Sequence, residues 1–291
     1  MRKVVVILLF ILIAFYFGFK NSIDNFIQKN IISNLIKYEG NDYYLENNYN
    51  YFKINNSLIA YDKEDLLNII YTFINKGTEK FSFFCSNDYF GCETDINDLM
   101  EDKSDIVYIN DFIHPYNSFA NINASIKNKK ITVTTTKIYS YSDIQNLNAI
   151  IKEIVDENID NTMDIKEKIK VLHNYMILNI DYDEIYADNI KNGIKNTNES
   201  NKATEALIKK HAVCSGYSDA LSILLNYLNI KNRKISNNIH VWNYVLIDDT
   251  WYHIDVTNDD FGNEISYQFF LVNTDTIKFD KNHNFLTNVY S

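Results

Sequence analysis

The chain has 291 residues, enough for one large domain or two modest ones, and 46% of them are hydrophobic, so it is expected to fold around a packed core. Its formal net charge is -10, and it has no long run of Lys or Arg. This composition argues against nucleic acid as the main partner, because such binding begins with neutralisation of phosphates.

The N-terminus predicts an export signal or a membrane anchor over residues 1–20. Arg2 and Lys3 precede an uninterrupted apolar run over residues 4–19, and a cleavage site of the Ala-x-Ala kind is missing. An uncleaved anchor is therefore the preferred interpretation, with the N-terminus in the cytoplasm and the rest outside. Cleavage and secretion are the alternative, and a buried helix of a soluble core fits less well because the run has no polar face.

Residues 21–60 are predicted to form a stalk and an irregular segment, and residues 61–140 a mixed α+β domain. In chain order, this domain is predicted to begin with a helix from Asp62 to about residue 76, which ends at Gly77, and a strand over 79–85. A short helix over 95–100 follows. Two strands over 121–125 and 130–139 are then predicted to pair around a turn at Asn128.

Two of the three cysteines lie in this domain. Cys85 and Cys92 bracket a polar loop, and a disulfide between them fits an extracytoplasmic compartment, leaving Cys214 as the odd thiol. Two unpaired thiols in a reducing compartment are the alternative. Metal binding by the pair is less favoured, because no His or Cys cluster with zinc spacing accompanies it.

Residues 141–291 form the second predicted domain, which begins with helices from 142 to 159 and from Asp164 to about 178. His173 lies in the apolar stripe of the second helix, which favours a histidine at the edge of the core over a chemical role. Residues 186–199 are polar and predict a loop that either borders a cleft or is ordinary surface.

Cys214 directly precedes a run whose apolar residues recur at helical spacing, so it is predicted to lie at a helix N-terminus. The unpaired backbone N–H groups and the positive end of the helix dipole favour a thiolate there. Such a site suits a nucleophile, while the competing interpretation is a small buried hydrophobic residue.

A predicted hairpin downstream offers a base and a carboxylate. Residues 240–247 and 250–256 alternate as strands around a turn at Asp248 and Asp249. A two-residue loop makes His240 and Asp255 diagonal neighbours on one face. Asp255 would then hold the imidazole in one tautomer and leave its other nitrogen for Cys214, whereas a register slip of one residue would separate them.

Three neighbours of this pair have weaker claims to a role. His253 shares the same face and is a rival base, but its register places it further from the open end of the hairpin. Trp242 and Trp251 are expected to contribute packing, although either can wall a cleft. Asp255 itself could be a surface charge at the end of a strand, but its apolar strand makes a partner more plausible.

These motifs resemble the transglutaminase-like superfamily. The resemblance is carried by segments 203–207, 213–220, 240–243 and 251–257. Further upstream, residues 168–175 resemble the helix that precedes the core in bacterial members, and Tyr182 and Asp183 resemble the Tyr-Asp pair of those members. The resemblance therefore covers roughly 160–285.

The resemblance implies an α+β, papain-like fold in which a Cys-bearing helix packs on an antiparallel sheet. It assigns Cys214 as nucleophile, His240 as general base and then acid, and Asp255 as orienting carboxylate. Ser215 departs from the frequent Gln, and Asp249 from the usual Gly, which requires a left-handed backbone that Asp tolerates. The second oxyanion donor stays unassigned.

The expected function is that of an exported thiol enzyme that acts on amide bonds of peptides or proteins through a thioester. Water as acceptor would make it a peptidase or amidase, and an amine would make it a protein-glutamine transglutaminase. Cell-envelope peptides are the suggested substrates, the membrane is the suggested partner of the N-terminal helix, and no cofactor or metal is expected, since EF-hand spacing is missing. The alternative is a non-catalytic envelope module that binds a peptide or glycan in the same cleft.

Overall fold

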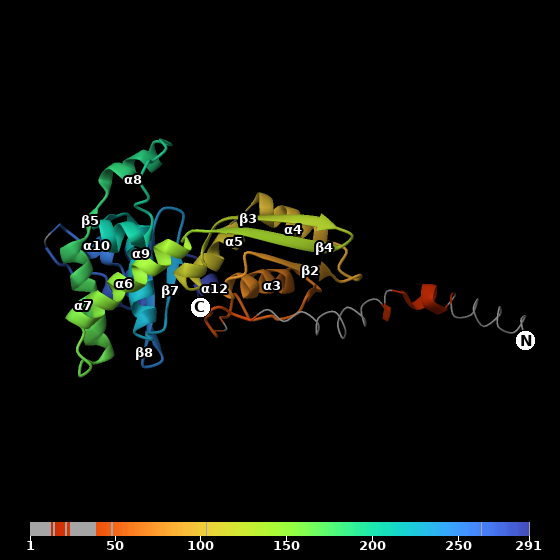
Figure 1. The fold of residues 1–291 in the computed structure, drawn as a ribbon, viewed down its shortest axis with the longest axis horizontal. Coiled ribbons are helices and arrows are strands. Elements are labelled where there is room, and N and C mark those ends of the chain that lie inside the picture. The colour runs from red at the N-terminus through yellow and green to blue at the C-terminus, as the bar shows by residue number, and fades with distance from the viewer. Residues whose placement is uncertain are drawn as a thin grey trace, which may run out of the picture. The chain divides into compact units, whose positions relative to one another are not determined.

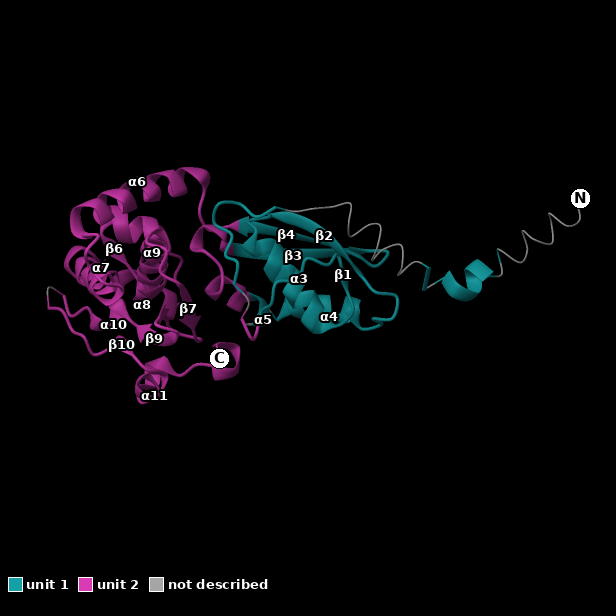
Figure 2. Cartoon of the chain, turned by 90° about the horizontal axis from the view of Figure 1, so that it is seen from below, with its two compact units in different colours: residues 1–48, 52–106, 120–136 teal, residues 49–51, 107–119, 137–291 magenta. Residues whose placement is uncertain are grey.

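The computed structural model describes residues 13, 15–20, 22–23, 39–47, 49–102, 104–262 and 264–290. The chain divides into two compact units, coloured separately in Figure 2. Unit 1 comprises residues 1–48, 52–106 and 120–136, and unit 2 comprises residues 49–51, 107–119 and 137–291.

The predicted anchor over 1–20 lies mostly outside the described residues. Residues 13 and 15–20 are helical. Within the part of the chain that the structure describes, no helix combines the length and apolar character needed to cross a membrane. Much of the predicted stalk also lies outside the described residues.

Unit 1 is a four-stranded sheet with helices. Its elements are β1 (Ile59–Ala60), α3 (Lys63–Asn75), β2 (Lys80–Cys85), α4 (Cys92–Glu101), β3 (Phe119–Lys127) and β4 (Lys130–Lys137), and α5 (Ser104–Val107) lies where the chain passes into unit 2. The strand order is β1-β2-β4-β3, with β1 parallel to β2 and β2 antiparallel to β4.

The local signals in this unit act as predicted. Asp62 caps α3 by accepting the N–H of Asp65, and the chain leaves this helix through Gly77, which has a positive φ of 77°. The strand over 79–85 is confirmed as β2, and the hairpin turn at Asn128 is confirmed between β3 and β4. The short helix α4 begins at residue 92 rather than 95. Cys85 and Cys92 form the disulfide, which leaves Cys214 as a free thiol.

Unit 2 combines helices with a second four-stranded sheet (Figure 1). Its longer helices are α6 (Tyr141–Asn158), α7 (Ile165–Asn179), α8 (Glu184–Lys191) and α9 (Cys214–Tyr227). Its short helical segments are η2 (Tyr108–Asp111), η3 (Pro115–Asn117), the π-helix η4 (Glu205–Lys209), α10 (Val256–Asp259), α11 (Thr274–Ile277), η5 (Lys281–His283) and α12 (Thr287–Tyr290).

The main sheet of unit 2 is antiparallel and has the order β10-β9-β8-β7. Its strands are β7 (Asn232–Ser236), β8 (Val241–Ile247), β9 (Thr250–Ile254) and β10 (Phe270–Val272), while β5 (Asp181–Tyr182) and β6 (His211–Ala212) form a separate parallel pair. Helix α9 packs against β7 and β8 (Figure 1). This arrangement of a Cys-bearing helix on an antiparallel sheet is the expected mixed α and β core.

One prediction in unit 2 is wrong in part. The segment 186–199, predicted as a loop, begins within helix α8, because the Asp183 side chain accepts the N–H of Tyr186 and caps a helix there. The helix runs to Lys191, and Gly193 follows with a φ of 66°. The remaining residues of the segment are turns and irregular chain, as predicted.

Candidate active site

Cys214 is the first residue of α9, as the apolar spacing predicted. Val213 precedes it in an extended conformation and has no side-chain oxygen with which to cap the first N–H groups of the helix. The thiol is partly exposed. The N-terminal end of α9 therefore presents backbone donors without a side-chain cap beside a partly exposed cysteine.

Two hydrogen bonds fix the first turns of α9 to strand β8. The Ser218 hydroxyl donates to the Val241 carbonyl at 2.9 Å, and the Asn243 amide donates to the Ser218 carbonyl at 2.9 Å. Both side chains are buried. The helix that carries Cys214 is thus held in register with the strand that follows His240.

The hairpin has the predicted register. Ile247 pairs with Thr250 and Asn243 with Ile254. Asp248 and Asp249 form the two-residue loop with φ angles of 48° and 60°, so both adopt the left-handed backbone that the hairpin turn requires. The departure at Asp249 is accommodated without a change of register.

This register brings His240 and Asp255 into direct contact. Nε2 of His240 lies 2.5 Å from Oδ2 of Asp255, and both side chains are largely buried. Burial alone would lower the pKa of His240, but the charge of Asp255 and the hydrogen bond to it outweigh burial and raise that pKa to about 10. Burial would likewise raise the pKa of Asp255, yet the charge and hydrogen bond of His240 hold it well below its usual range.

Cys214 interacts with the same histidine, His240. The Cys214 sulfur accepts a hydrogen bond from the imidazolium, and this bond and the negative charge of the thiolate contribute further to the raised pKa of His240. Since Nε2 of His240 is bonded to Asp255, Nδ1 is the nitrogen left for the thiol. The structure thus brings together the three residues that the sequence singled out.

Two further residues bind Asp255 and were not identified from the sequence. Nε2 of His283 lies 2.8 Å from Oδ2 of Asp255, and the Asn258 amide donates to the same oxygen at 2.8 Å. The backbone N–H of Asn258 donates to Oδ1 at 3.1 Å. Asp255 caps the short helix α10, and this capping pattern is the one local signal that could have drawn attention to Asn258.

The remaining candidates have structural surroundings. His253 accepts the indole N–H of Trp242 at 3.0 Å and contacts Thr274, and burial followed by the charge of His283 lowers its pKa to about 3. Trp242 is buried and stacks on His240. Trp251 packs on the Arg233 guanidinium. Outside this group, His173 is a buried, hydrogen-bonded histidine as predicted, with Nε2 at 3.1 Å from Oδ2 of Asp259, but its complete burial places it within the core and not at its edge.

Two histidines and a carboxylate in close contact can also bind a metal ion. His240, Asp255 and His283 offer ligand atoms within 4.8 Å of one another. However, Asp255 lies 2.5 and 2.8 Å from the two imidazole nitrogens, whereas ligands placed 2.0–2.1 Å from a tetrahedral zinc are roughly 3.3 Å apart. The observed spacing is that of a hydrogen-bonded network.

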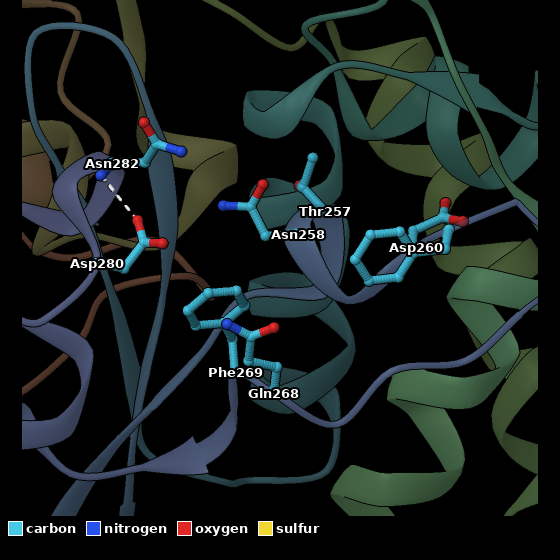
Figure 3. A pocket seen from close by; sticks show the side chains of 8 residues that line it. Thr257, Asn258, Asp260, Gln268, Phe269, Asp280 and Asn282 are labelled. Atoms are coloured by element: carbon cyan, nitrogen blue, oxygen red, sulfur yellow. Dashed lines mark hydrogen bonds between the residues drawn. The ribbon is translucent and has the colours of Figure 1, made fainter.

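A cavity of about 260 Å³ adjoins this network (Figure 3). Figure 3 shows Asn258 between Asp260 on one side and Asp280 with Asn282 on the other. Because Asn258 is bonded to Asp255, the cavity lies next to the histidine and carboxylate pair. Its lining is completed by Thr257, Phe261, Gln268 and Phe269.

Comparison with known proteins is consistent with this geometry. Residues 152–256 match the sequence model of the transglutaminase-like superfamily, a range that contains Cys214, His240 and Asp255. This part of the chain is therefore similar to the transglutaminase-like superfamily. Asn258 and His283 lie beyond the matched range.

Two solved structures are similar to parts of the chain. One, described as a TGase, has 15% sequence identity and a TM-score of 0.39 over 51% of this chain and 47% of its own. The other, a candidate cysteine protease from Cytophaga hutchinsonii, has 12% identity and a TM-score of 0.30 over 47% of this chain and 61% of its own. The chain thus spans less than two thirds of the length of either. No curated protein matches the sequence.

Proposed function

We propose that the protein is a thiol acyl-transfer enzyme that acts on amide bonds through Cys214. The observation that carries this proposal is the 2.5 Å contact between His240 and Asp255 on the hairpin, with the remaining His240 nitrogen available to the thiol at the start of α9. Nucleophile, proton carrier and orienting carboxylate are the parts that such chemistry requires.

The first half of the reaction forms a thioester. The Cys214 sulfur attacks the amide carbonyl carbon, a carbon–sulfur bond forms, and the oxygen carries the negative charge toward the backbone N–H groups of α9. Protonated His240 donates its Nδ1 proton to the leaving nitrogen as the carbon–nitrogen bond breaks. The amine departs, and the acyl group stays on sulfur.

The second half depends on the acceptor. His240, now neutral, removes a proton from water or from an amine, which attacks the thioester and releases the thiolate. Water yields a carboxylic acid, as in a peptidase or amidase, and this is the outcome we propose. The second candidate is protein-glutamine transglutaminase activity, which the adjoining cavity favours because Asp260 and Asp280 suit a cationic amine.

We further propose that the enzyme works outside the cytoplasm on peptides or proteins of the cell envelope. Two observations support this location. The charged start and apolar run over residues 2–19 are typical of export or anchoring, and the Cys85–Cys92 disulfide is typical of oxidising compartments.

A glutamine-containing peptide offered with and without a primary amine tests the proposal. We expect wild type to release ammonia or a peptide fragment, and Cys214→Ala to lose the reaction completely. Incorporation of the amine would favour the transglutaminase. Turnover that survives Cys214→Ala would refute the nucleophile, and a wild-type protein that binds peptides without turnover would instead be the non-catalytic module.

A further inference from the structure

His283 is buried between two carboxylates. Its Nε2 lies 2.8 Å from Oδ2 of Asp255, and its Nδ1 lies 3.2 Å from Oδ1 of Asp280. The His283 side chain is fully buried, and its ring packs on Trp242 and Phe269. This histidine belongs to the candidate site by contact, although it lies in η5, outside the range of the family match.

The carboxylate oxygens on both sides of this ring limit the hydrogen bonds that its two nitrogens can make. An ionised carboxylate only accepts hydrogen bonds, so a nitrogen bonded to one must donate. Asp255 accepts from His240 and Asn258 as well, and Oδ1 of Asp280 also accepts the backbone N–H of Asn282 at 2.7 Å. Each ring nitrogen of His283 therefore faces a carboxylate oxygen that already accepts another hydrogen bond.

We propose that His283 is a cationic positioning residue, held between Asp280 and Asp255, that weakens the hold of Asp255 on the proton of His240. This proposal rests on the proposed acyl transfer. A cation beside Asp255 offsets part of its negative charge, and His240 becomes a stronger acid toward the leaving nitrogen. His283 also fixes the Asp255 carboxylate in place, so that the orientation of His240 does not depend on a single bond.

Few other charged groups near His283 could offset the charge of Asp255 in its place. His240 faces it across an edge-to-face ring contact of 5.5 Å, and beyond His240 lies Cys214. The charge of His283 helps to lower the pKa of His253, and the charges of Arg233 and Lys278 act in the same direction.

The segment that carries His283 is tied to the loop that carries His240. The Asn237 amide donates to the carbonyl oxygens of Asn282 and Asn284 at 2.8 and 3.0 Å. The Asn237 side-chain oxygen accepts the backbone N–H of His240 at 2.8 Å. His283 is thus placed relative to His240 by a rigid link as well as through Asp255.

Substitutions that separate charge from packing test the proposal. His283→Gln keeps a donor toward Asp255 and removes the charge, and Asp280→Asn keeps the cap of η5 while removing the anion that holds the second proton. In both variants we expect turnover of an amide substrate to fall about tenfold, while turnover of a matched activated ester changes by less than about twofold, because a good leaving group needs little proton donation. The double variant should be no worse than either single variant.

His253→Gln is the matched control, since it truncates a buried histidine of the same aromatic cluster, and it should leave the amide-to-ester ratio unchanged. Equal losses on amide and ester in His283→Gln would show a merely structural role and overturn the proposal. If wild type turned over neither substrate, the proposed function would fail, and ¹⁵N NMR of the full chain would still decide the inference. There, one unprotonated nitrogen on His283 at neutral pH would refute it.

Discussion

Asp255 is the residue on which the candidate site converges. Oδ2 accepts hydrogen bonds from His240, His283 and Asn258, and Oδ1 accepts the Asn258 backbone N–H. A carboxylate that is fully buried survives as an anion only when it is saturated in this way. Its charge is also the main influence that raises the pKa of His240 against the effect of burial.

Asp255→Asn is therefore expected to change the pH dependence as well as the rate. In wild type the imidazolium form of His240 persists until the pH approaches its pKa of about 10. Without the charge and hydrogen bond of Asp255, burial opposes only the smaller contribution of Cys214, so the pKa of His240 falls and the alkaline limb of kcat/KM moves to lower pH. At neutral pH we expect a loss of about 10³- to 10⁴-fold.

Measured pH–rate profiles of the two proteins check this expectation. Asp249→Asn in the hairpin turn is the matched control, since this position tolerates Asn and is exposed. A profile of Asp255→Asn that keeps the wild-type alkaline limb would show that Asp255 does not control the protonation of His240.

The residues of the site differ in how far the sequence predicts them. His240 and Asp255 lie on two strands joined by a two-residue turn, so a local register argument is enough to pair them. His283 lies 28 residues beyond Asp255, in a short 3₁₀ segment. No periodicity or turn chemistry specifies where such a segment packs, and only the tertiary fold reveals its contact.

At the scale of elements, helix α9 depends on a close backbone approach at Gly216. A Cβ atom added there would lie 2.6 Å from the Ser200 carbonyl oxygen and 2.8 Å from the Ala212 Cβ. Both contacts are shorter than van der Waals packing allows. The absence of a side chain at Gly216 therefore permits the chain before α9 to pack tightly against its first turn, which holds Cys214 in place.

Gly216→Ala should accordingly destabilise this part of unit 2. Relief of the overlap requires the backbone at Ser200 or Ala212 to move, and overpacking of this kind costs about 1–3 kcal/mol of unfolding free energy. Urea unfolding measures the loss, with Ser215→Ala on the same turn as the control, expected within about 0.5 kcal/mol of wild type. Equal stability of Gly216→Ala and wild type would contradict the tight packing.

The elements themselves were largely predictable where local signals are strong. Asp62 and Asp164 cap helices at the predicted positions, and the β8–β9 hairpin follows from its alternation and turn. Strands β7 and β10 were not predicted. β7 carries Arg233 and Lys234 at buried positions, where the stacking of Arg233 on aromatic rings and the bond from Lys234 to Asp219 compensate the charges. These compensating contacts form only in the tertiary structure, so the two charged residues hide the strand from a prediction based on hydrophobic pattern.

At the scale of the whole molecule, the disulfide and the candidate site belong to different units. Cys85 and Cys92 join β2 to α4 in unit 1, whereas Cys214, His240 and Asp255 lie in unit 2. The free energy that the disulfide contributes should therefore be separable from the chemistry of the thiol.

The double substitution Cys85→Ala, Cys92→Ala tests this separation. Closing a loop with a sequence separation of 7 stabilises a fold by about 2–3 kcal/mol in the chain-entropy model, so chemical unfolding should detect a loss of that order. The rate at which iodoacetamide alkylates Cys214 should stay within about twofold of wild type, as expected when the disulfide and the site act independently. A large fall in that rate would show that the site depends on the integrity of unit 1.

The three side chains that donate to Oδ2 of Asp255 come from successive points of the chain, and His283 is the last of them. During synthesis the hairpin with His240 and Asp255 emerges before η5 does. Until η5 docks, Asp255 lacks one of its donors and His240 lacks the anchor that Asn237 makes to Asn282. A chain in which η5 has not yet docked therefore lacks part of the hydrogen-bond network around Asp255 and His240.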